Sequence, residues 1–174
     1  MGKKVIKVGL STKGINAAIK ELERYEREIA RKADTIRERV AERIQALAQS
    51  GFNGAVVDDL IGEGQRTADV KVDVTHGDNI SIVITNGDDA IWVEFGAGVY
   101  HNGAVGSSPH PRGAEFGFTI GTYGKGFGAR KAWGFRDEDG ELHLTHGAPA
   151  VMPMYNAVKS VCNEIDSIAR EVFK

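Results

Sequence analysis

The closely spaced glycines Gly124, Gly126 and Gly128 are the first candidates for chemistry, because glycine-rich turns let backbone N–H groups approach a phosphate. Their spacing differs from the Gly-x-Gly-x-x-Gly pattern of dinucleotide-binding folds, and no strand–helix–strand unit is predicted around them. Lys125 follows Gly124 without the Ser or Thr that a P-loop requires next. The sequence therefore favours no phosphate or nucleotide site here.

Metal ligation and nucleophilic catalysis have equally little support. The chain contains five histidines and one cysteine, and it lacks both the His-Glu-x-x-His pattern and the paired cysteines of zinc sites. His143 and His146 are three residues apart in a predicted strand or loop, so their side chains need not converge, and Asp58 and Asp59 fall in a predicted linker. A Gly-x-Ser-x-Gly nucleophile elbow is also missing. We expect no catalytic residue, no metal and no cofactor, and hence no enzyme activity.

Bulk composition limits the classes of function. A chain of 174 residues is long enough for one domain with its own core, so we expect a single domain over residues 1–174. The net charge of −2 provides no general attraction to nucleic acid, and no run of about 18 apolar residues is present that would cross a membrane. Cys162 has no partner for an intrachain disulfide, and we expect it to be a buried thiol in a reducing cytoplasm.

Basic and aromatic residues are interspersed with glycine between Tyr123 and Arg136. Tyr, Trp, Phe and Arg are enriched at protein interfaces, and glycines between such anchors suit an arm that becomes ordered on a partner. The same residue types could stack on single-stranded nucleic acid, but we favour the protein interface. The candidate interface residues are Tyr123, Lys125, Phe127, Arg130, Lys131 and Trp133.

This segment belongs to a glycine-rich insertion over residues 96–134, which holds half of the 22 glycines. Loops of this length inside a compact domain are usually functional or disordered. We interpret the insertion as an arm, and the alternative is a lid over a ligand pocket.

Residues 15–49 carry apolar side chains mostly at intervals of three, four and seven, which predicts one long amphipathic helix. Ser50 and Gly51 are its expected end. At 1.5 Å per residue the helix would be about 50 Å long, which exceeds the width of a small domain. Either the rest of the domain covers the whole apolar stripe, or part of the stripe projects and contacts another subunit.

Alternating apolar residues predict an antiparallel hairpin with strands over residues 68–75 and 80–85. A second hairpin is predicted over residues 135–144, a loop over 52–65, and a short edge strand over 3–10. The side chains expected on the buried face of the first hairpin are Val70, Val72, Val74, Ile80, Ile82 and Ile84.

A C-terminal helix is predicted to begin at Pro153, because proline is tolerated in the first turn of a helix, and to end near Val172. Its apolar stripe should pack beside the long helix. The expected fold is therefore α+β, with a long N-terminal helix and a C-terminal helix packed on a small antiparallel β-sheet, and with a long glycine-rich insertion.

The stretch from Ala90 to Gly98 joins the first hairpin to the insertion. We favour a short helical turn in which Ile91 and Phe95 share one face and Gly96 ends the turn, with Asp88 as its cap. The alternative is a third strand. The expected structural anchors are Ile91, Trp92, Phe95, Gly96, Pro149 and Pro153.

Two segments carry a family resemblance. Trp92-Val93-Glu94-Phe95-Gly96-Ala97-Gly98 is similar to a Val-Glu-Phe-Gly-Thr-Gly segment, with Ala97 in place of Thr. Gly147-Ala148-Pro149-Ala150-Val151-Met152-Pro153 is a looser match to a Gly-x-Pro-Ala-x-Pro-Phe-Met-x-Pro-Ala segment. Together with the order of helices and hairpin, these segments make most of the chain, except the insertion, resemble the head–tail joining proteins of tailed phages (siphophages) and prophages, the neck or tail-completion family.

The resemblance implies a virion structural protein rather than an enzyme. Family members are α+β subunits that form a ring between the connector and the tail tube, so this chain would form a homo-oligomeric ring, with a hexamer as the candidate stoichiometry. Its partners would be other phage neck, connector and tail proteins, and DNA would pass through the lumen without specific binding. The protein would be assembled in the bacterial host cytoplasm and reside in the virion, without contact to a membrane. The alternatives are a tail terminator, and an oligomeric enzyme or ligand-binding domain with residues 96–134 as a lid.

Overall fold

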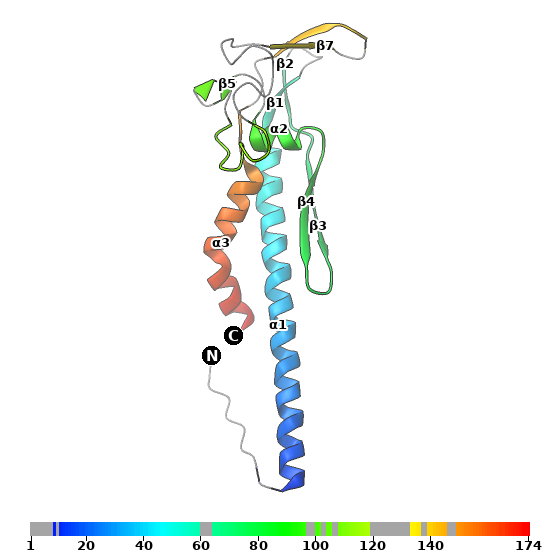
Figure 1. Cartoon of the computed structure of the whole chain (residues 1–174), viewed down its shortest axis with the longest axis vertical. Helices are drawn as coiled ribbons and strands as arrows, with labels where there is room; N and C mark the ends of the chain where they lie inside the picture. The colour runs from blue at the N-terminus through cyan, green and yellow to red at the C-terminus, as the bar shows by residue number, and fades with distance from the viewer. Residues whose placement is uncertain are drawn as a thin grey trace.

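The computed structural model describes residues 9, 11–59, 64–96, 100–101, 104–105, 108–118, 133–136, 139–145 and 149–174. It confirms the α+β class, with a long N-terminal helix, a C-terminal helix and small antiparallel sheets (Figure 1). The described strands form four separate two-stranded sheets. The predicted edge strand over 3–10 and most of the glycine-rich insertion lie outside the described residues.

Helix α1 (Thr12–Asn53) is the axis of the molecule. It begins where Ser11 Oγ accepts a hydrogen bond from Gly14 N at 3.1 Å, and its 42 residues span about 63 Å. The predicted helix is confirmed, but the predicted end at Ser50 and Gly51 is wrong. The helix continues through Gly51, and Pro153 packs there: a Cβ on residue 51 would lie 2.9 Å from the Pro153 Cβ.

Strands β1 (Val56–Asp59) and β2 (Gly64–Thr67) form an antiparallel ribbon directly after α1. The prediction of a loop over 52–65 is therefore wrong. Ala55 and Val57 turn inward and are almost completely buried, whereas β2 is exposed throughout. Because so few side chains of this ribbon point inward, its sequence lacks the alternation of apolar and polar residues from which a strand is predicted.

Strands β3 (Lys71–His76) and β4 (Ser81–Asn86) form the predicted first hairpin. Val72 is buried as expected, but the predicted buried face of β4 is wrong. Val83 lies opposite Val74 and packs toward the core, and the isoleucines face outward. Because β4 has apolar residues on both faces, alternation could not decide which face is buried. The exposed fractions are 58% for Ile80, 51% for Ile82 and 51% for Ile84.

The upper end of the molecule holds the remaining short elements. Helix α2 (Ala90–Phe95) confirms the helical turn, and Gly96 ends it with a φ of 82°. Strands β5 (Tyr100–His101) and β6 (Ala104–Val105) pair with each other. Strands β7 (Trp133–Arg136) and β8 (Leu142–Thr145) form the predicted second hairpin, which turns at Gly140 with a φ of 82°.

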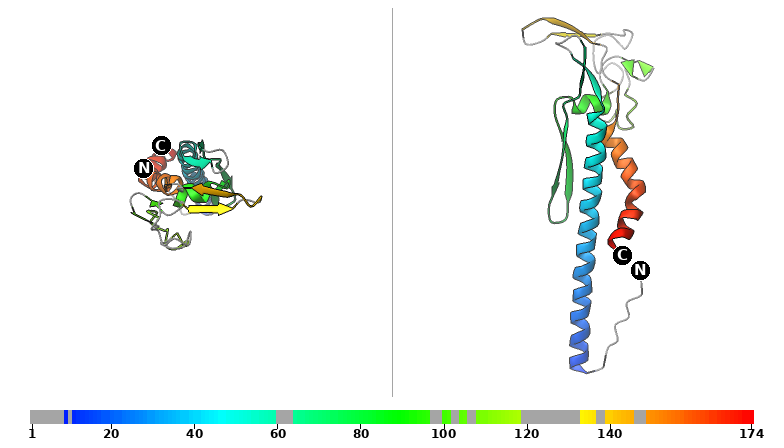
Figure 2. Two further views of the ribbon diagram at one scale, coloured as in Figure 1. Left: turned by 90° about the horizontal axis from the view of Figure 1, so that it is seen from above. Right: turned by 180° about the vertical axis from the view of Figure 1, so that it is seen from behind.

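Helix α3 (Pro153–Val172) starts at Pro153 as predicted and runs back along α1. It lies on one side of α1 and the β3–β4 hairpin lies on the other, as both views from front and back show (Figures 1 and 2). Val161 faces α1 and is 1% exposed, while the next residue, Cys162, is exposed. The prediction of a buried thiol is wrong, because one residue along a helix turns the side chain by about 100°.

The core lies where α1, α3, β1, β3 and α2 meet. Phe52 is completely buried, and its neighbours are small or β-branched residues. The buried cluster consists of Ala48, Phe52, Ala55, Val57, Ala68, Val70, Val72, Val93 and Ala157.

The N-terminal half of α1 projects beyond this core (Figures 1 and 2). Helix α3 ends beside Lys32, whose Nζ lies 5.1 Å from the Phe173 ring centre. Below that level the apolar stripe continues with Ile15, Ile19 and Leu22, which are 45%, 47% and 55% exposed. Part of the stripe therefore lacks a cover from the described chain. No helix in the described ranges is long and apolar enough to span a bilayer.

Replacing Phe52 with alanine is expected to lower the free energy of unfolding by about 3–5 kcal/mol, because it removes a fully buried ring from the core. Urea denaturation measures the change. The matched control is Phe116→Ala, at a ring that is 49% exposed, and it should cost less than half as much. Equal losses in the two variants would contradict the assignment of the core.

Candidate functional site

A buried carboxylate, that of Glu94, connects three parts of the chain. The last turn of α2 directs Glu94 inward, where it is 8% exposed. Its Oε2 accepts a hydrogen bond from Met154 N at 2.8 Å, and its Oε1 accepts one from Tyr155 N at 2.9 Å. These N–H groups belong to the first turn of α3, which has no helical partners for them and favours negative charge. Glu94 therefore caps α3 from a different helix.

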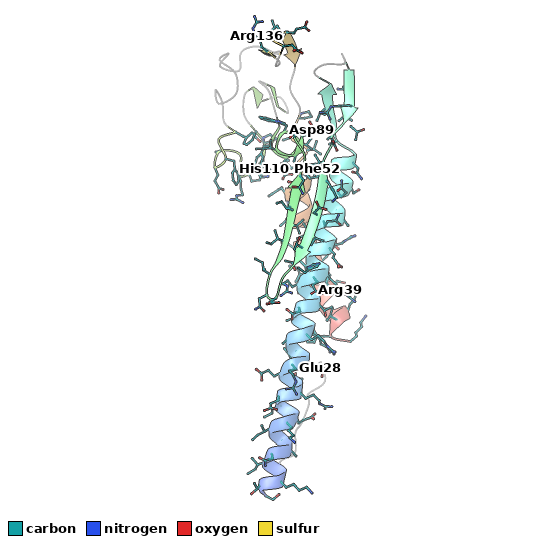
Figure 3. The ribbon with its side chains drawn as sticks, turned by 90° about the vertical axis from the view of Figure 1, so that its right-hand side faces the viewer. Glu28, Arg39, Phe52, Asp89, His110 and Arg136 are labelled. Carbon is teal, nitrogen blue, oxygen red and sulfur yellow. The ribbon has the colours of Figure 1, made fainter. Side chains whose placement is uncertain are left out.

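His110, labelled in Figure 3, is the third partner of this carboxylate. The ring is 7% exposed, and its Nε2 lies 3.2 Å from Glu94 Oε1. Its Nδ1 accepts a hydrogen bond from Arg112 N at 3.1 Å. Because Nδ1 accepts, the hydrogen of the neutral ring belongs on Nε2, from which it is donated to Glu94. All the ring's hydrogen-bonding capacity is thus used inside the protein.

Aromatic rings surround this polar centre. The Phe95 ring lies 4.3 Å from the His110 ring and 4.5 Å from the Phe118 ring, measured between ring centres, and Phe116 lies 5.4 Å away. Ser108 Oγ donates a hydrogen bond to the Phe95 carbonyl. Residues 108–118 of the glycine-rich insertion are therefore packed on α2 and form part of the folded domain.

The two segments that carry the family resemblance meet at α2. The Val93 carbonyl accepts hydrogen bonds from Val151 N at 2.9 Å and from Met152 N at 3.4 Å. Met152, the residue before α3, has a φ of 58°, a conformation that is uncommon outside glycine. The chain is thus turned sharply into α3 at the point where Val93 and Glu94 hold it.

A second polar contact joins α2 to the strands (Figure 3). Asp89 is 9% exposed, and its carboxylate contacts Arg66 at 2.6 and 2.9 Å and accepts a hydrogen bond from Asp69 N at 2.9 Å. Burial on its own would raise the pKa of Asp89. The hydrogen bonds from Arg66 and Asp69 and the charge of Arg66 outweigh this effect, so the pKa is lower than that of an ordinary aspartate.

The arrangement is suited to structural support. Both oxygens of Glu94 and both nitrogens of His110 already have partners within the fold. Within the described ranges no group of three or more His, Cys, Asp or Glu residues is placed to hold a metal ion.

The structure describes only part of the sequence-predicted sites. The candidate interface residues Tyr123, Lys125, Phe127, Arg130 and Lys131 lie outside the described residues, and of Trp133 only the backbone is placed, at the start of β7. The side chains of Asp58, Asp59, His143 and His146 also lie outside the description.

The predicted anchors have mixed outcomes. Pro153 is buried and Trp92 and Phe95 are partly buried, but Ile91 is 47% exposed and Pro149 is exposed. The prediction for Ile91 is wrong because α2 buries Val93 and Glu94 rather than the face shared by Ile91 and Phe95.

Sequence reasoning missed Glu94, His110 and Asp89 as organising residues. One signal was available for Glu94, which lies between Val93 and Phe95 in an apolar stretch. Such an acid is either buried with its apolar neighbours or exposed by an interruption of the buried segment, and a buried acid needs hydrogen-bond partners. His110 had no comparable signal, because its partner is 16 residues away in the chain.

Three exposed apolar rows form the candidate interaction surface. The first, here called the hairpin row, is Ile80, Ile82 and Ile84 on β3–β4. The second, the α1 row, is Ile15, Ile19 and Leu22 on the projecting half of α1. The third, the α3 row, is Val158, Cys162 and Ile165, in which Val158 is 42% and Ile165 is 40% exposed.

Comparison of the chain with protein-family models, with curated proteins and with solved structures finds no match.

Replacing Glu94 with alanine is expected to lower the free energy of unfolding by about 2–4 kcal/mol, because two buried N–H groups lose their acceptor. Thermal or urea denaturation measures the loss. The control is Glu115→Ala, which removes an exposed ion pair with Arg112 and should cost much less, because solvent screens the pair. A Glu94 variant as stable as this control would rule out the capping role.

The lowered pKa of Asp89 predicts an acid-dependent loss of stability. A depressed pKa means that the folded protein binds this proton more weakly than the unfolded chain does. The contribution is thus complete above the unfolded-state pKa of about 4, and it is lost as the pH falls through the lower folded-state value. Asp89→Asn should be less stable near neutral pH, and its difference from the wild type should shrink below about pH 4. Melting temperatures from pH 2 to 7 measure this. A constant difference across that range would contradict it, and Asp166→Asn, at an exposed aspartate, is the control.

Proposed function

We propose that the chain is a structural subunit of a phage virion that forms a homo-oligomeric ring in the head–tail neck or tail-completion assembly. In this role its partners are further copies of itself and the neighbouring neck, connector and tail proteins. DNA passes through the lumen of the ring without specific contacts. A hexamer is the candidate stoichiometry.

The observation that carries the proposal is the set of exposed apolar rows on a rod-shaped subunit. Contiguous apolar surface on a folded protein marks contact with other proteins or with a membrane. Here the rows lie on α1, α3 and β3–β4, and α3 and the hairpin lie on opposite sides of α1. Such a subunit has surface to bury against neighbours along its length.

The packing of α2 against the start of α3 also supports the proposal. The resemblance rests on the segments around Glu94 and Pro153, which are far apart in the sequence. The backbone of Val93 and the carboxylate of Glu94 join these segments directly. A shared motif pair is more informative when its two parts form one structural unit, since chance similarity has no reason to select contacting segments.

Net charge fits a channel that DNA crosses. The chain has 22 Lys and Arg residues against 24 Asp and Glu residues. A subunit of this charge provides no strong attraction for phosphates, so DNA would move through a ring of such subunits without being held.

The proposal predicts that the purified protein assembles in a concentration-dependent way into closed rings. Light scattering during gel filtration measures the mass, and negative-stain electron microscopy shows whether the particles are annular. Mass spectrometry of virions from the phage or prophage that carries the gene then tests its location. A monomer at every concentration, together with absence from the virions, would refute the proposal.

A further inference from the structure

We propose that neighbouring copies meet head to tail, with the hairpin row of one copy packed on the α3 row of the next. This inference rests on the proposed ring, and it specifies which surfaces join the subunits. The occupant of each row is therefore a second copy of the same chain.

The hairpin row is an unusual solvent face for a strand. Val72 and Val83 of the hairpin pack toward the core, so its other face carries Ile80, Ile82 and Ile84, each more than half exposed, beside Lys71, Asp73 and Thr75 of the partner strand. Two-stranded hairpins are marginal in water, and their free face is normally polar. A row of three isoleucines there is expected where a further layer covers the hairpin.

The α3 row has the matching form. Val158, Cys162 and Ile165 are spaced four and three residues apart, so they make one stripe beside the residues that face α1. A helix packed on the open face of a two-stranded sheet is the arrangement that α1 already makes with the inner face of the hairpin. The second contact would place the hairpin between two helices.

The two rows overlap in height along α1. Arg43 pairs with Glu164 at 3.0 Å, which sets the level of Ile165 near the middle of the C-terminal half of α1. On the other side, Arg37 Nε donates to Ser81 Oγ at 3.3 Å and Gln45 donates to the Val72 carbonyl at 2.8 Å. Ile82 and Ile84 lie between these two levels. Ile165 lies within the same range, so copies placed side by side bring it to the height of Ile82 and Ile84, whereas Val158 lies higher, toward the level at which Pro153 packs on Gly51.

Charges at equal height are complementary. Asp78 at the hairpin tip is placed by Arg37, and Arg170 lies at a similar level because its neighbour Glu171 pairs with Arg39 at 3.7 Å. Asp73 of β3 is already paired with Lys71 at 2.7 Å, so the complementary charges of the contact are Asp78 on the hairpin and Arg170 on α3.

The relative placement of the rows determines the kind of assembly. Because α3 and β3–β4 lie on opposite sides of α1, one copy offers a different surface to each of two neighbours. Such heterologous contacts propagate, and they close into a ring when successive copies are related by rotation without translation. The overlap of the two rows at the height of Ile165 is what a contact without a large translation requires.

Mixing two variants tests the inference. Ile82→Glu disables the hairpin row and leaves the α3 row intact, and Ile165→Glu does the reverse. Under conditions in which the wild type forms rings, each variant alone should be monomeric, with the circular dichroism spectrum of the wild type. Their equimolar mixture should form a one-to-one dimer that grows no further, because only one competent contact remains. Sedimentation velocity distinguishes monomer, dimer and ring.

Charge reversal provides an independent test that leaves the core untouched. Asp78→Arg and Arg170→Asp should each weaken association by about tenfold, and the double variant should recover most of it. Lys20→Asp, on the exposed surface of the projecting half of α1, is the control and should leave association unchanged.

The outcomes separate this inference from the proposed function. If Ile165→Glu alone assembles like the wild type while Ile82→Glu does not, the hairpin rows meet each other and the head-to-tail contact is refuted. If the wild type forms rings and neither glutamate variant changes them, this interface is wrong but the ring stands. If the wild type never assembles, both proposals fail.

Discussion

The carboxylate of Glu94 is the contact on which the rest of the structure depends. It is buried, and it binds two N–H groups of the first turn of α3 and the ring of His110. Burying a carboxylate is costly unless its oxygens are fully hydrogen-bonded, and these partners supply the bonds. These hydrogen bonds of Glu94 join α2, α3 and residues 108–118 at one point. Because α3 then runs down α1 from that point, Glu94 also sets the height of α3 along the rod.

Much of the fold was predictable because it follows from periodicity. Long helices repeat their pattern many times, so α1 and α3 were identified from apolar spacing and from Pro153. Short elements were less predictable. Strands β1 and β2 bury too few side chains to show a pattern. Strand β4 is apolar on both faces, and its pairing, in which Val83 lies opposite Val74, determines that Val83 faces inward. The polar site was not predictable beyond Glu94, since its other members come from distant positions in the chain.

The error at β4 and the proposed assembly have a common cause. A strand with apolar residues on both faces is what a middle layer requires, and within one copy the hairpin is an outer layer. The sequence of β4 therefore fits the assembled state better than the isolated subunit. The same reasoning applies to the α1 row, where Ile15, Ile19 and Leu22 extend a stripe beyond the end of α3. That row lies below the hairpin, so in the proposed ring it would remain available to a different partner.

Folding and assembly depend on separate sets of residues in this arrangement. Glu94 and Asp89 lie where α2 meets the strands and α3, whereas Ile82 and Ile165 are exposed residues of the hairpin and of α3. Substitutions at sites without shared partners usually act independently on stability. The surface rows can therefore be altered without disturbing the buried carboxylates. The hairpin also carries the charged residues Lys71, Asp73 and Asp78, and charges on an exposed hairpin oppose non-specific pairing of its strands.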